Sequence, residues 1–160
     1  MNMSFTLRTA KPGDEDLILA LLHELAVYEK LTAKFKITRE VIARDFIGEH
    51  APLKVDLLYE GDKPAGIATW YFTYNSFAVS RGVFLEDLFV RPEFRGRGYG
   101  KALIAHLARQ VVKVDGNKVE WAVLDWNTPS IDFYEGLGAE RMSGWHIYSL
   151  AGEALAKLGS

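Results

Sequence analysis

Apolar residues recur every three or four positions in two long stretches of the chain, which is the pattern of helices with one buried face. The first stretch ends at Tyr28, and the second covers about 98–114. Two shorter helices are predicted at 38–47, where Thr38 can cap the first turn, and at 127–136, which begins with a Thr-Pro pair. The pattern therefore predicts four helices.

The segments between these helices contain short apolar runs bounded by turn residues, which predicts strands. The predicted strands are 5–8, 53–59, 65–74, 83–90, 118–124 and 146–150. A turn at Glu60–Pro64 joins the second and third of them as an antiparallel hairpin. Because antiparallel strands come first and a strand–helix–strand unit follows, the order predicts one α/β domain over 1–160 with a mixed sheet that is not doubly wound.

Composition limits the class of protein further. The chain has 160 residues, of which 49% are hydrophobic and 12% aromatic, and this suits a globular domain and excludes disorder. It has no cysteine, which excludes disulfides, thiolate metal sites and a cysteine nucleophile. The longest apolar run, 17–22, is far shorter than the roughly 18 residues of a membrane helix, and the N-terminus has no signal-peptide core. We therefore expect a cytoplasmic protein.

Positive charge is concentrated in one short segment. The net charge of the chain is −2, which gives no general attraction to nucleic acid or to anionic membranes. Residues 91–101 nevertheless carry four cations and one acid, a local charge of +3. The segment joins a predicted strand to a predicted helix and has glycines at 96, 98 and 100, so main-chain N–H groups can approach a ligand closely. We interpret it as a binding loop for a compact anion such as a diphosphate.

Two common diphosphate loops do not fit this segment. A Walker loop needs Ser or Thr after its lysine, where this chain has Ala102. The dinucleotide fingerprint needs a different glycine spacing. Arg95, Gly98 and Gly100 instead match the pattern Arg/Gln-x-x-Gly-x-Gly/Ala. With this pattern the chain resembles the GNAT superfamily of N-acetyltransferases, in which main-chain amides of the loop hold the pyrophosphate of acetyl-CoA.

Four further segments extend the resemblance. Residues 24–30, 71–74, 85–90 and 125–134 resemble the diamine (spermidine/spermine) and thialysine acetyltransferase subfamily, in the expected order. The resemblance implies the GNAT fold, whose central mixed, largely antiparallel sheet splays apart and is flanked by helices. It implies acetyl-CoA as co-substrate, and no metal is predicted because the four histidines lack ligand spacing. The residues that it assigns to the coenzyme are Leu88, Phe89, Val90, Arg95, Gly96, Arg97, Gly98, Tyr99, Gly100, Lys101, Asn127, Ser130 and Tyr134.

The chemistry of acetyl transfer needs a base and an acid. A lysine-like amine has a pKa of about 10.4, so keeping it neutral at pH 7 costs about 4.6 kcal/mol and a general base is useful. The resemblance assigns that role to Glu86, acting through water, and leaves a cation-binding role open. Tyr134, from the family's Asn-x-x-Ala/Ser-x-x-x-Tyr motif, would protonate the leaving thiolate. Main-chain N–H groups near 88–90 would stabilise the oxyanion, and Asn127 would bind the pantetheine arm or cap its helix.

The same resemblance assigns the acceptor site. The candidate residues for amine binding are Tyr28, Glu29, Glu86, Asp87, Trp121 and Trp145. Carboxylates and a tryptophan face suit a cation. In a regular strand Glu86 and Asp87 point to opposite faces, so only one of them addresses a given cleft. Asn75, Ser143 and Phe77 replace acids and a tryptophan of polyamine-acetylating relatives, which favours a smaller amine such as a short diamine or a thialysine-like amino acid.

Two other functions are compatible with these residues. A non-catalytic acyl-CoA sensor would keep the coenzyme loop without turnover, and an acetyltransferase for peptide or protein amines would keep it with another acceptor. The sequence favours direct acetyl transfer from acetyl-CoA to the primary amine of a small molecule: a diamine, a polyamine or a thialysine-like amino acid. Relatives commonly form homodimers that exchange or pair their C-terminal strands, so the resemblance implies a homodimer, with no nucleic-acid or membrane partner.

Overall fold

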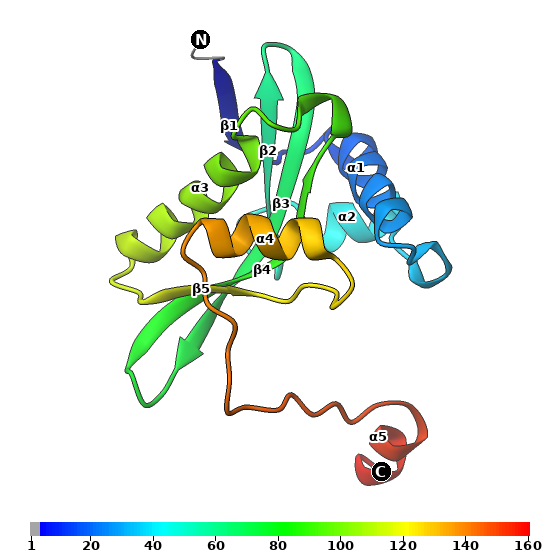
Figure 1. The fold of residues 1–160 in the computed structure, drawn as a ribbon. Coiled ribbons are helices and arrows are strands. Elements are labelled where there is room, and N and C mark those ends of the chain that lie inside the picture. Colours follow the sequence, from blue (N-terminus) through cyan, green and yellow to red (C-terminus); the bar gives the residue numbers. More distant parts are fainter. Residues whose placement is uncertain (1–3) are drawn as a thin grey trace. The chain divides into compact units, whose positions relative to one another are not determined.

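Helices and strands follow one another along the chain nearly as the apolar pattern predicts (Figure 1). The computed structural model describes residues 4–160. Its strands are β1 (Phe5–Thr9), β2 (Lys54–Glu60), β3 (Lys63–Asn75), β4 (Ser80–Val90) and β5 (Lys118–Trp121). Its α-helices are α1 (Glu15–Tyr28), α2 (Arg39–Asp45), α3 (Tyr99–Lys113), α4 (Thr128–Gly136) and α5 (Gly152–Leu158), and short 3₁₀ helices lie at η1 (Thr32–Lys34) and η2 (Pro92–Phe94). The chain divides into two units, Met1–Asp125 and Trp126–Ser160.

The first unit is built on one five-stranded sheet with the order β1-β2-β3-β4-β5. Neighbouring strands are antiparallel as far as β4, and β5 runs parallel to β4. Glu60 pairs with Lys63, so the turn of the β2–β3 hairpin is shorter than predicted and Glu60 itself belongs to the sheet. The predicted α/β architecture with a mixed, largely antiparallel sheet is confirmed.

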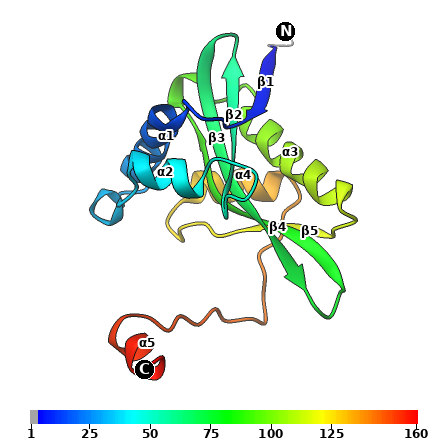
Figure 2. The same cartoon turned by 180° about the vertical axis from the view of Figure 1, so that it is seen from behind.

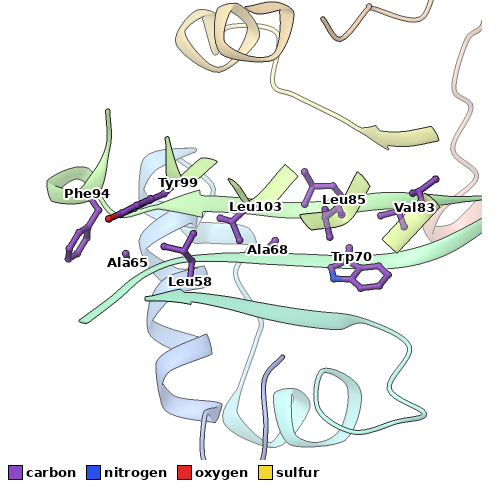
Figure 3. Packing of buried hydrophobic residues seen from close by; sticks show 11 residues of the cluster. Leu58, Ala65, Ala68, Trp70, Val83, Leu85, Phe94, Tyr99 and Leu103 are labelled. Carbon is purple, nitrogen blue, oxygen red and sulfur yellow. The ribbon is translucent and has the colours of Figure 1, made fainter. Parts of the chain in front are cut away.

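Helices cover both faces of this sheet, with α1 and α2 on one face and α3 on the other (Figures 1 and 2). The apolar side of α3 is buried and consists of Tyr99, Leu103, Leu107 and Val111. Figure 3 shows Tyr99 and Leu103 in one cluster with Leu58, Trp70 and Leu85 of the sheet. Full burial of one such side chain stabilises the fold by about 1.5–3 kcal/mol. Packing of this kind fixes the start of α3 against the sheet.

The opposite face of the sheet carries a second apolar cluster. Its buried members are Ala10, Ile18, Leu21, Leu22, Leu25, Ile42, Val55, Leu57, Ile67 and Phe89. Thr38 caps α2 as predicted, because its Oγ1 accepts a 3.3 Å hydrogen bond from the N–H of Val41. α1 ends at Tyr28, so Glu29 is its C-cap residue. The C-terminal end of α1 and the β4 residue Phe89 thus belong to the same side of the molecule.

The second unit contains α4, an extended segment and α5. The strand predicted at 146–150 is wrong, because these residues carry no strand and their side chains are exposed, Ile147 to 97% and Tyr148 to 92%. A strand needs a hydrogen-bonded neighbour, and residues 126–160, all of which the structure describes, contain no other strand. The sequence does not predict α5, and β5 ends at Trp121 rather than at Leu124.

Candidate active site

The glycine loop, defined here as residues 91–98, connects β4 to α3. Gly96 has φ 74° and Gly98 has φ 82°, both left-handed, and a Cβ atom added to either would meet nothing within 4 Å. The first hydrogen bond within α3 runs from the N–H of Ala102 to Gly98 O, at 2.9 Å. The N–H groups of residues 99–101 therefore precede the helical bonding pattern and carry the positive end of the helix dipole. An open backbone with these donors fits a diphosphate.

The arginine side chains of the glycine loop contact groups of the protein. Arg91 lies 2.8 Å from Glu24, and Arg97 lies 2.7 Å from Glu60. Arg95 donates from Nε to Val90 O at 2.9 Å, and its guanidinium carbon lies 5.1 Å from the centre of the Tyr28 ring. Two of the four cations counted in the sequence are thus neutralised by carboxylates from distant segments. The role of Arg95, Arg97 and Lys101 in coenzyme binding stays a prediction.

The sheet separates next to the glycine loop. β5 pairs with β4 only from Gly82 to Leu85, and the last pair is Leu85 with Trp121. β4 continues to Val90 and pairs there only with β3, among the residues that the structure describes. The outer edge of β4 is therefore without a strand neighbour at Leu88, Phe89 and Val90, which are the residues whose main chain the sequence assigns to the coenzyme. Trp121 lies where the two strands part.

Glu86 forms a β-bulge in β4. Leu85 pairs with Trp70 and Asp87 pairs with Thr69, so Glu86 is one residue more than β3 has opposite it. We call the apolar cluster that contains the buried side of α3 the α3-side cluster. Because of the extra residue, Val83 and Leu85 pack in this cluster, and so do Leu88 and Val90. The regular alternation expected for this strand is therefore wrong at Glu86 and Asp87. A bulge arises where one strand has more residues than its partner between two consecutive pairs. The sequence of β4 alone does not show how many residues β3 places opposite it, so the bulge could not be predicted.

Asp87 acts electrostatically on two other carboxylates, Glu29 and Glu86, and we call these three residues the carboxylate cluster. Burial raises the pKa of Asp87, and a hydrogen bond from the Thr69 hydroxyl partly opposes this rise. Burial also raises the pKa values of Glu86 and Glu29, and the charge of Asp87 raises both further. Like charges held together in this way favour a bound proton or a bound cation.

Two tyrosines lie next to members of the carboxylate cluster: Tyr71 interacts with Glu86, and Tyr28 precedes Glu29. The rings of Tyr71 and Phe84 are stacked with their centres 5.4 Å apart. Burial raises the pKa of Tyr71, and the charge of Glu86 raises it further, so the phenol stays protonated beside Glu86. Tyr28 lies at the end of α1 beneath Arg95. The structure thus brings the predicted residues Tyr28, Glu29, Glu86 and Asp87 to one region of the first unit.

Four predicted site residues belong to the second unit. Asn127 is buried and caps α4, because its Oδ1 accepts a 3.4 Å hydrogen bond from the N–H of Ser130. Tyr134 is half-buried near the end of α4, with its ring centre 5.3 Å from that of Phe133. Trp145 is exposed in the extended segment. The helix-capping interpretation of Asn127 is confirmed, and the roles of the four residues toward coenzyme or amine stay predictions.

Several residues that support the site were not found from the sequence. Thr69 holds Asp87, Glu24 holds Arg91 and Glu60 holds Arg97. No motif identifies them, because each acts through a partner that is distant in the chain. Within residues 4–160, no three His, Cys, Asp or Glu side chains are arranged to hold a metal ion, and no helix is both long and apolar enough to cross a membrane.

Comparisons with known proteins agree with this geometry. Residues 19–139 match the model of the acetyltransferase (GNAT) family. The chain is 36% identical to the thialysine N-epsilon-acetyltransferase of Bos taurus, over 98% of each protein. It is 29% identical to the L-ornithine N5-acetyltransferase of Arabidopsis thaliana, over 93% of this chain and 85% of the relative. Among solved structures, an integron cassette protein from V. cholerae superposes with a TM-score of 0.81 at 25% identity, over 99% of each chain. The protein is a member of the GNAT family of acetyltransferases.

Proposed function

We propose that this GNAT acetyltransferase acetylates the primary amine of a small molecule with a short cationic chain. The observation that carries the proposal is the carboxylate cluster, in which Glu29 and Glu86 both interact with the half-buried Asp87. The pKa values of all three carboxylates are raised by burial, and those of Glu29 and Glu86 also by the charge of Asp87, so an approaching cation stabilises their ionised forms. A protonated amine supplies that charge.

Acetyl-CoA, the co-substrate that the family implies, supplies the acetyl thioester. The open backbone of Gly96 and Gly98 and the first-turn N–H groups of α3 support binding of its diphosphate at the glycine loop. The outer edge of β4 at 88–90 supports binding of an extended arm as an added strand, with main-chain groups as donors and acceptors. The same N–H groups would donate to the carbonyl oxygen that gains charge during transfer.

In the proposed mechanism Glu86 takes up the proton of the amine through water. Burial and the charge of Asp87 raise the pKa of Glu86. The difference between its pKa and that of the amine is therefore smaller than for an ordinary glutamate, so Glu86 is the stronger base. Tyr134 is proposed as the acid that protonates the leaving sulfur. Glu29 and Asp87 would hold the distal positive charge of the acceptor, and Tyr28, Trp121 and Trp145 would supply its aromatic walls.

The acceptor class is proposed from the site and from the relatives together. The thialysine and ornithine acetyltransferases named above act, by their names, on amino acids with a side-chain amine. Asn75 and Ser143 leave this chain fewer acids than a long polycation would use, and Phe77 stands in place of a tryptophan. We therefore rank a thialysine-like amino acid or a short diamine ahead of a polyamine.

Thiol release from acetyl-CoA, measured with a panel of amines, tests the proposal. The panel holds thialysine, ornithine, short diamines, spermidine and lysine peptides at equal concentration. We expect the highest kcat/KM for an acceptor with a short amine-bearing chain. Coenzyme binding without thiol release from any amine would instead support an acyl-CoA sensor, and release with peptides alone would support a protein acetyltransferase.

We also propose a cytoplasmic homodimer. Support for the dimer comes from the extended segment of the second unit, where Trp145, Ile147 and Tyr148 are exposed apolar side chains. Such residues are normally covered in the working protein. The cytoplasmic location remains an expectation from the sequence, whose longest apolar run is far shorter than a membrane helix and whose N-terminus lacks a signal-peptide core.

A further inference from the structure

Glu60, the last residue of β2, holds the glycine loop on both sides of Gly98. Arg97 Nη1 lies 2.7 Å from each carboxylate oxygen of Glu60. The hydroxyl of Tyr99 donates to Oε2 of the same carboxylate. Arg97 precedes Gly98, the N-cap residue of α3, and Tyr99 follows it. One carboxylate therefore bridges the glycine at which the chain turns into the helix.

The anchor of this bridge is the sheet itself. Glu60 pairs with Phe5 of β1 and with Lys63 of β3, so its main chain is held from both sides. The ring of Phe5 also meets the ring of Tyr99 edge-on, with the centres 5.8 Å apart. Tyr99 is buried in the α3-side cluster. The bridge thus connects the turn at Gly98 to the central sheet.

The direction of the first-turn N–H groups of α3 depends on the backbone at Gly98. A glycine in open space has more accessible conformations than any other residue, so fixing it on ligand binding costs conformational entropy. A bridge that fixes Arg97 and Tyr99 beforehand removes part of that cost. We propose that Glu60 is a positioning residue, which orders the glycine loop for the diphosphate of acetyl-CoA through Arg97 and Tyr99. The inference rests on the proposed function, because it takes acetyl-CoA as the molecule that the loop binds.

A competing role for Glu60 makes the opposite prediction. A carboxylate beside Arg97 could occupy the guanidinium in place of a phosphate, and its removal would then strengthen coenzyme binding. The contact with Tyr99 favours the positioning role. Tyr99 is uncharged, so competition between Glu60 and a phosphate for the Arg97 guanidinium does not explain why Glu60 also binds the Tyr99 hydroxyl. Hydrogen bonds from Arg97 and Tyr99 lower the pKa of Glu60, so the carboxylate remains ionised at neutral pH and the bridge persists.

The test compares wild type with Glu60→Gln, using two acetyl donors and one good amine. Acetyl-CoA carries the diphosphate, and S-acetylpantetheine lacks it. We expect the KM for acetyl-CoA and the calorimetric Kd for CoA to rise about tenfold in the variant, with kcat within about twofold, because charge-assisted hydrogen bonds are lost. kcat/KM for S-acetylpantetheine should stay the same. Tyr99→Phe removes one arm of the bridge and should give a smaller rise in the KM for acetyl-CoA.

Asp45→Asn is the matched control, since it neutralises an exposed carboxylate that pairs with Arg44 away from the loop. An unchanged or lower KM for acetyl-CoA in Glu60→Gln overturns the positioning role. An equal loss with both donors overturns it as well, because the damage would then be general. If wild type itself binds no CoA, the proposed function fails together with this inference, whereas CoA binding that is equal in wild type and Glu60→Gln removes only the inference.

Discussion

Asp87 is a half-buried carboxylate that interacts with two other carboxylates, and its charge is unfavourable to the folded chain. Burial raises its pKa in spite of the hydrogen bond from Thr69. A carboxyl group with a raised pKa holds its proton more tightly in the folded state than in the unfolded state. Stability therefore falls as pH rises through the range between the two pKa values, and it stays lower above that range. At neutral pH the ionised carboxyl group of Asp87 therefore makes the folded protein less stable than an uncharged side chain at this position would.

Replacement of Asp87 by Asn tests this cost. The Asp87→Asn side chain keeps an oxygen that can accept from Thr69 and removes the charge that acts on Glu29 and Glu86. We expect a gain in unfolding free energy on the order of 1 kcal/mol at pH 8. The gain should shrink toward pH 4, where the wild-type carboxyl becomes protonated. Urea unfolding at both pH values measures it.

Asp45→Asn provides the control for this measurement. Arg44 lowers the pKa of Asp45, so loss of that carboxylate should give no gain at either pH. The same Asp87→Asn protein should lose kcat/KM for the amine, because the acceptor loses part of its counter-charge. A variant that gains nothing at pH 8 would contradict the assignment of an unfavourable charge.

Tyr134→Phe tests the proposed acid. Without the phenol the leaving sulfur has no proton donor, and we expect kcat to fall about 100-fold, within the usual range for general acid catalysis. The calorimetric Kd for CoA should change less than about twofold, because the ring is retained. Tyr74→Phe, at an exposed tyrosine of β3, is the control and should leave kcat unchanged. An unaltered kcat in Tyr134→Phe removes the acid role.

The sequence identifies candidate chemical residues of the site, whose roles stay predictions, and it does not identify the residues that support them. The glycine loop is a continuous motif, and Glu86 and Asp87 lie in the strand before it. Their supports act at a distance: Thr69 is 18 residues from Asp87, and Glu60 is 37 residues from Arg97. Such contacts depend on strand register and helix packing, which a single sequence states only indirectly.

At the scale of secondary-structure elements, helices α1, α2, α3 and α4 follow their predictions because an amphipathic repeat and a cap are local features. Strand pairing is not local. The bulge in β4 and the early end of β5 arise from the number of residues in partner strands and from where those partners turn away. These two irregularities open the edge of β4 and place Glu86 and Asp87, so they shape the candidate site more than the regular elements do.

The glycine loop offers a prediction at this scale. In Gly98→Ala the new Cβ meets no atom, so the loss of stability comes only from the left-handed backbone and should be about 1–2 kcal/mol. Strain there should also turn the first-turn N–H groups of α3 and weaken CoA binding about tenfold. Gly48→Ala, with φ 112° and equal free space, should lose at least as much stability and keep the CoA affinity. Equal CoA affinities in the two variants would contradict a backbone cradle at Gly98.

At the scale of the whole molecule, the second unit contains an extended segment between α4 and α5 whose apolar side chains are exposed. The predicted strand at 146–150 has the composition of a strand and lacks a partner within its own unit. A sequence pattern indicates that a segment can form a strand, and a partner chain can supply the neighbouring strand that the single chain lacks. The proposed homodimer would provide that partner.

Light scattering on the purified protein tests the dimer. We expect a mass of two 18.0 kDa chains for wild type. The double substitution Ile147→Lys and Tyr148→Lys places two charges on the exposed segment and should give single chains. Val112→Lys, at an exposed apolar residue of α3, is the control and should leave the mass unchanged. A wild-type mass of one chain would remove the proposal.

Residue 86 is surplus to the scaffold. If it were deleted, Leu85 and Asp87 would become consecutive and would face their present β3 partners, Trp70 and Thr69, in regular antiparallel register. Every other side chain of β4 would keep the face that it now occupies. We therefore expect the architecture to tolerate the loss of this position, and the reaction proposed for its carboxylate to be lost. A chain one amino acid shorter would separate the ability to fold from the ability to turn over substrate.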